Sequence, residues 1–89
     1  IAAIQGFGGL LAADAGGKVA HASANVAGLL GLPEAPAPGT PLAAILAPGA
    51  LAALEQALGG LAGVDTLERR FGLDLAGTGT LFDCAVHRS

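Results

Sequence analysis

The sequence predicts an α+β domain in which an antiparallel sheet carries short helices on one face. Residues 7–23 and 66–88 each contain two runs typical of strands, separated by a glycine-containing turn. Residues 24–60 instead carry leucines at helical spacing between residues that start and stop helices. The predicted element order is therefore β-β-α-α-β-β. The chain has 89 residues, which allows one small domain over residues 1–89.

A hairpin is predicted in the first quarter of the chain. Ile1–Gln5 is expected to be an arm that enters the fold. Phe7–Ala13 is predicted to be a strand, and its glycines at 8 and 9 indicate a bulge. Asp14–Gly17 forms the turn, and Lys18–Ser23 returns antiparallel.

A short helix is expected directly after this hairpin. Asn25 is predicted to be its N-cap, with Ser23 as the alternative. Apolar residues then recur at helical spacing up to Leu30. Gly31 can adopt the left-handed conformation that ends a helix, and Pro33 prevents the helix from resuming.

Two further helical segments are expected before the second hairpin. Thr40 is predicted to cap the first of them, with Pro41 at its first position. Pro48 opens the second, which ends at Gly59 and Gly60. Its apolar face consists of Leu51, Leu54, Leu58 and Leu61.

The last two predicted strands are Thr66–Leu73 and Thr80–Arg88. One face of the first carries Leu67, Arg69, Phe71 and Leu73, and the other carries Thr66, Glu68 and Arg70. In the second, Phe82, Cys84 and Val86 alternate with Asp83, Ala85 and His87.

Composition argues against several classes of partner. The formal net charge is −3 with four cationic side chains, which is too few for a surface that follows nucleic-acid phosphates. The longest stretch without polar residues, 42–54, is interrupted by proline and is too short for a membrane span. A single cysteine and no recognisable signal peptide favour a cytoplasmic location. The absence of methionine leads us to expect an excerpt of a longer protein.

No catalytic or metal-binding constellation emerges from the sequence. Cys84 and His87 are three apart in a strand and point to opposite faces, so they cannot readily share an ion. His21 has no evident further ligands to complete a metal site. Ser23 near His21 lacks the G-x-S-x-G context of a hydrolase. We therefore expect no enzymatic activity in this domain.

The order of these motifs resembles PAS sensory domains, and in particular the N-terminal PAS domain of phytochromes and bacteriophytochromes. The strand, the Ser-x-Asn sequence, the short helix, Leu-Leu-Gly and proline follow the PAS pattern. Ile4-Gln5-Gly6-Phe7-Gly8 resembles the Ile-Gln-Pro-His-Gly motif that opens the phytochrome domain, but it lacks the Pro and His. Gly39-Thr40-Pro41-Leu42 and the closing Val86-His87-Arg88 match further segments.

The resemblance implies a non-catalytic signal-transduction module in a photoreceptor-like protein. A GAF-like domain would follow it in the same chain, with a histidine kinase or another output domain beyond. The bilin-attaching cysteine of that family lies upstream of the opening motif, so Cys84 is not its counterpart. We expect no cofactor in this domain, although the full-length protein could bind a bilin. The alternative is a sensor that binds a small molecule in an apolar pocket lined by Val19, Leu29, Phe71 and Phe82.

PAS domains resemble one another in having five strands in the order 2-1-5-4-3, whereas four are predicted here. The final strand would lie between Phe7–Ala13 and Thr80–Arg88, so its absence would leave two unpaired edges facing a gap. Unpaired buried backbone groups are costly. Three outcomes are open: the chain continues with the missing strand, a second copy fills the gap, or the two hairpins close on each other. We expect the second outcome, a homodimer.

Overall fold

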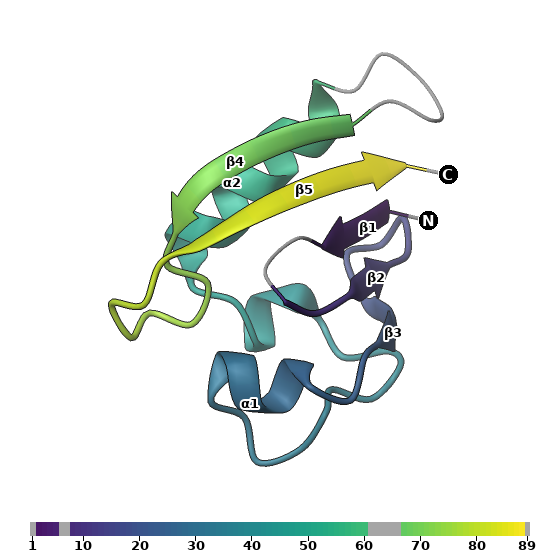
Figure 1. Ribbon diagram of the computed structural model, residues 1–89. Helices are drawn as coiled ribbons and strands as arrows, with labels where there is room; N and C mark the ends of the chain where they lie inside the picture. Colours follow the sequence, from purple (N-terminus) through teal and green to yellow (C-terminus); the bar gives the residue numbers. More distant parts are fainter. Residues whose placement is uncertain (1, 6–7, 61–66, 89) are drawn as a thin grey trace.

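A five-stranded antiparallel sheet in the order β3-β2-β1-β5-β4 organises the fold (Figure 1). The computed structural model describes residues 2–5, 8–60 and 67–88. The strands are β1 (Ala2–Gln5), β2 (Leu11–Ala13), β3 (Val19–Ala22), β4 (Leu67–Leu73) and β5 (Phe82–Arg88). The predicted α+β class is confirmed. The predicted strand positions Phe7 and Thr66 lie outside the described residues.

Strand β1 is the main departure from the predicted fold. The expected arm forms a strand from Ala2, which pairs antiparallel with both β2 and β5. Ile4 lies opposite Leu11 on one side and Val86 on the other. The expected gap between the hairpins is therefore wrong, because the chain's own first strand fills it. Strand β1 has only four residues, two of them alanine, so its sequence carries no periodic strand signal. It forms because its backbone pairs with the edges of two other strands and because Ile4 becomes buried.

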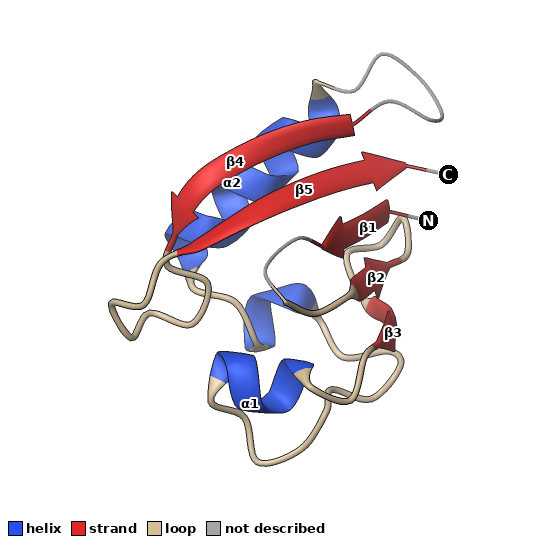
Figure 2. Cartoon of the chain, in the orientation of Figure 1, coloured by secondary structure: helices blue, strands red, loops and turns tan. Residues whose placement is uncertain are grey.

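In the described part of the chain, three helical segments lie between the two hairpins (Figure 2). They are α1 (Val26–Leu30), the 3₁₀-helix η1 (Leu42–Ala44) and α2 (Pro48–Gly59). Pro48 opens α2 as predicted, whereas Leu61 lies outside the described residues. Thr40 does not cap η1, because its hydroxyl donates to the Ala37 carbonyl (2.7 Å) and the N-cap position belongs to Pro41.

The core lies between one face of the sheet and the helices. Helix α2 packs against β4 and β5 and lies behind them in Figure 1. The largest fully buried side chains are Ile4, Leu11, Val19, Val26, Leu54, Leu75 and Val86. Helix α2 contributes Leu54 together with the small residues Ala50 and Ala57. These small side chains leave little bulk between the helix and the sheet.

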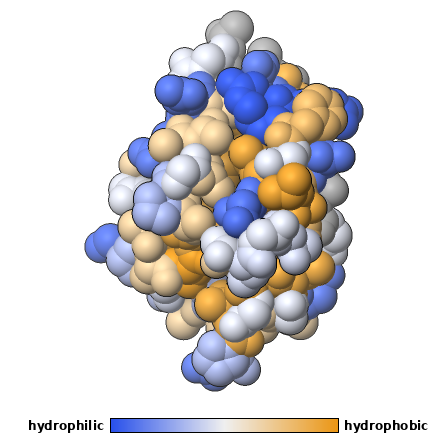
Figure 3. All heavy atoms as spheres, turned by 90° about the vertical axis from the view of Figure 1, so that its left-hand side faces the viewer, coloured by the Kyte–Doolittle hydropathy of each residue, from blue (hydrophilic) through white to orange (hydrophobic). Residues whose placement is uncertain are grey.

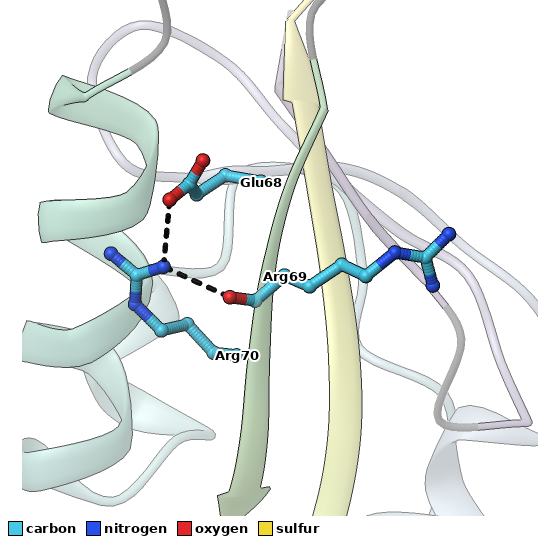
Figure 4. A network of polar contacts seen from close by, with 3 residues as sticks. All are labelled: Glu68, Arg69 and Arg70. Carbon is cyan, nitrogen blue, oxygen red and sulfur yellow. Dashed lines mark hydrogen bonds and ion pairs between the residues drawn. The ribbon is translucent and has the colours of Figure 1, made fainter.

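Strand β4 turns its predicted apolar face to solvent. Leu67 and Phe71 are 46% and 70% exposed, whereas Glu68 and Arg70 lie on the side of α2 (Figure 4). A register shift between Arg70 and Leu73 separates Leu73 from that face and lets it pack against the core. Alternation alone shows which residues share a face but not which face is covered, and it cannot locate a bulge.

Candidate functional site

Hydrogen bonds join the start of α1 to the chain that enters β2. The Asn25 side-chain amide donates to the carbonyl of Gly8, and its oxygen accepts from the Ser23 hydroxyl (2.7 Å). The Ser23 hydroxyl oxygen also accepts from the backbone N–H of Leu10 (2.9 Å). Asn25 occupies the N-cap position but makes no side-chain capping bond. The predicted cap is therefore wrong, and neither Ser23 nor Asn25 acts as one: both bind the preceding segment instead.

The other end of α1 follows the prediction. Gly31 adopts a left-handed conformation (φ 69°, ψ 28°), and its N–H donates to the carbonyl of Ala27. The N–H of Leu32 donates to the same carbonyl (2.8 Å). A β-carbon at Gly31 would meet no atom within 4 Å, so backbone conformation and not space favours glycine here.

The four residues predicted to line a pocket differ in their burial. Val19 is buried in the core, and Leu29 and Phe82 are partly buried against it. Phe71 is exposed, as are Leu67 and Leu81. Elsewhere on the surface, apolar patches lie between hydrophilic ones (Figure 3).

A groove of about 790 Å³ lies between the β2–β3 turn, η1 and α2. Its apolar lining includes Leu42 of η1 with Leu51 and Leu58 of α2. The turn residues 14–17 and Glu55 supply its polar part. The Asp14 carboxylate holds this turn by accepting from the N–H groups of residues 16 and 18 (2.9 and 3.0 Å). None of the four predicted pocket residues lines this groove.

The candidate metal ligands are dispersed. Cys84 is buried on the core side of β5, whereas His21 is exposed on β3. Burial and the neighbouring Asp83 carboxylate raise the pKa of the Cys84 thiol to about 11. Among the residues that the structure describes, no three metal-ligating side chains cluster. Cys84 is therefore a protonated core residue at neutral pH.

Within the same described ranges, no helix is both long and apolar enough to cross a membrane.

A family model described as PAS fold matches residues 2–89. The chain belongs to the PAS fold family. No curated protein and no solved structure matches it. In this PAS domain, β1 lies between β2 and β5, where the resemblance led us to expect the final strand.

Three features of the PAS domain escaped sequence reasoning. Strand β1 is short and rich in alanine, and the groove joins segments far apart in the sequence. The bond from Asn25 to Gly8 spans 17 positions. One available signal was the Ser-x-Asn pair itself, since two short polar side chains after a strand can bond to neighbouring backbone as readily as to a helix.

Proposed function

We propose that this PAS domain is a non-catalytic signal-relay module of a cytoplasmic, phytochrome-like protein or sensor histidine kinase. The observation that carries the proposal is the family match over residues 2–89, since PAS domains generally serve sensing and signalling. The phytochrome-like motifs give further support. The pair Ile4-Gln5 and the segment 86–88 come from opposite ends of the sequence, yet β1 and β5 lie side by side in the sheet.

The relay would act through packing. Helix α2 packs on β4 and β5, and β5 pairs with β1. A signal that shifts α2 would therefore change the packing of β5 and of its neighbour β1. These two strands carry the last and first described residues. Such a domain biases an equilibrium between two packing arrangements and needs no reaction of its own.

The test uses the full-length gene product and its output, such as histidine autophosphorylation. Leu54→Ala removes a buried side chain between α2 and the sheet, whereas Gln56→Ala changes an exposed residue of the same helix outside the groove. We expect a several-fold change in output from Leu54→Ala and none from Gln56→Ala, with both proteins folded by circular dichroism. Equal output from both folded variants would contradict the relay.

A second candidate function is small-molecule sensing, favoured by the groove between η1 and α2. Its volume of about 790 Å³ falls within the range of small-molecule sites. Leu51→Glu would place a charge against its apolar lining. Native mass spectrometry of the purified protein would detect a retained ligand, and its loss in Leu51→Glu but not in Ala52→Glu would assign it to the groove.

We also propose that the isolated domain binds no bilin covalently, although the full-length protein could. The supporting observation is that its cysteine, Cys84, is buried in the core and protonated at neutral pH. The protein is incubated with biliverdin and run on a denaturing gel under zinc fluorescence. A fluorescent band that disappears in Cys84→Ala would refute the proposal.

A further inference from the structure

The outer edge of β4 combines an open strand edge with exposed apolar side chains. Strand β4 ends the sheet order, and its one partner among the described strands is β5. An edge strand presents backbone N–H and C=O groups that can pair with another strand. Leu67 and Phe71 on this strand are among the exposed large apolar side chains of the described chain. The edge therefore offers both backbone pairing and apolar area.

The sequence of this edge is complementary to itself. In an antiparallel pair, residues directly opposite each other lie on the same face of the sheet. Centring two copies on Arg69 places Leu67 opposite the other copy's Phe71, and Glu68 opposite its Arg70. By symmetry each pair occurs twice. Two apolar pairs and two opposite-charge pairs thus flank one central contact.

Neighbouring registers lack this complementarity. Centring on Arg70 places two Arg70 residues opposite each other and leaves Glu68 opposite Gly72. Centring on Glu68 places two carboxylates together and Leu67 opposite Arg69. Each of the three registers places one pair of like charges at its centre, but only the register centred on Arg69 adds opposite-charge and apolar pairs on both sides, so this register is favoured.

The side chains are already held where this register needs them. Arg70 Nη1 lies 3.1 Å from the Glu68 carboxylate, and both groups project on the α2 side of the sheet (Figure 4). Two such pairs from two copies would form a square of alternating charges. Arg70 Nη1 also donates to the Arg69 carbonyl (2.9 Å). That oxygen has a second lone pair, so it can still accept a bond from a partner strand.

From this edge we infer that the chain forms a homodimer in which two β4 strands pair antiparallel about Arg69 and join two sheets. The opposed Arg69 side chains are its unfavourable contact. They project on the face of β4 away from α2, where solvent screens their repulsion. A short edge buries little area, so we expect a dissociation constant in the micromolar range.

Charge exchange between two variants provides the test. Glu68→Arg gives a strand with three arginines and Arg70→Glu gives one with two glutamates, so each alone opposes like charges across the dimer. We expect sedimentation equilibrium at tens to hundreds of micromolar to show monomers for each variant and a dimer for wild type. Their equimolar mixture should form a heterodimer. Both variants lack the Glu68–Arg70 ion pair within the strand, so only contacts between chains can restore association.

Two further variants separate this interface from others. Arg69→Gln removes the opposed charges and should tighten the dimer several-fold. Glu55→Arg makes the same charge change on exposed α2 and should leave the dimer unchanged. A monomeric wild type, or folded variants whose mixture stays monomeric, would overturn the inference. So would dimers in both single variants, because association would then use another surface.

Discussion

Substitutions of Asn25 can distinguish between two roles of its side chain: capping α1, or linking the start of α1 to the segment before β2. The structure gives its amide one donated bond, to the Gly8 carbonyl, and no capping bond to α1. Asn25→Ala removes that donor at an exposed position, so we expect a loss of about 1 kcal/mol in the free energy of unfolding. For a domain of this size, this corresponds to roughly 4–8 °C in melting temperature.

The informative comparison is with Asn25→Asp. Asparagine and aspartate are nearly equivalent as N-caps, so a capping role predicts no loss. A carboxylate cannot donate to the Gly8 carbonyl, so the link predicts that Asn25→Asp at neutral pH destabilises at least as much as Asn25→Ala. Urea denaturation of the three proteins measures both differences. Wild-type stability in Asn25→Asp would refute the reasoning.

A double-mutant cycle tests the second half of this link. The Ser23 hydroxyl donates to Asn25 and accepts from the Leu10 N–H. The double variant Ser23→Ala/Asn25→Ala should therefore lose less free energy of unfolding than the sum of the losses in the two single variants. We expect a coupling energy of about 0.5–1 kcal/mol. Strict additivity would show that the two side chains act independently.

Three further tests address the sheet, α1 and the core thiol. If β1 is a central strand, Ile4→Ala should lower the free energy of unfolding measured in urea by about 2–4 kcal/mol. The control Leu81→Ala changes an exposed side chain and should lower it by less than about 0.5 kcal/mol. Similar losses in the two variants would contradict the central position of β1. Gly28→Ala, with open space around its β-carbon, should raise the melting temperature, and Gly31→Ala, at φ 69°, should lower it; changes of the same sign would contradict the left-handed end of α1. The Cys84 pKa rises from 9.0 unfolded to about 11 folded, so its contribution to stability is complete below pH 9 and is lost as the pH rises to 11. Denaturation at pH 9 and pH 11 should show that the free energy of unfolding falls less in Cys84→Ala than in wild type. Equal falls in the two proteins would refute the burial of the thiol.

The strongest sequence signals were those with local causes. The left-handed end of α1 at Gly31 and the start of α2 at Pro48 depend on backbone preferences of single residues, and both were predicted correctly. Cys84 and Val86 also face the core as their alternation predicted. These preferences act within one or two turns of chain, so a short window of sequence contains them.

The failures had non-local causes. Strand β1 exists because two distant strands, β2 and β5, offer it edges, and its own four residues give no sign of this. Alternation placed Phe71 on one face of its strand but could not show that this face is exposed. Its exposure depends on which face of β4 meets α2, and that is decided by packing across the whole sheet.

The pairing of β1 with β5 determines how this domain would respond to tension along the chain. Ala2 lies opposite Arg88, so the first and last described residues are neighbours at the same end of two antiparallel strands (Figure 1). A force that pulls these two residues apart would break the hydrogen bonds between β1 and β5 one after another from that end, because it acts across the strands and not along them. The sheet would part at its centre while the β2–β3 and β4–β5 hairpins stayed intact. Little force should be needed, because each step breaks only one or two bonds.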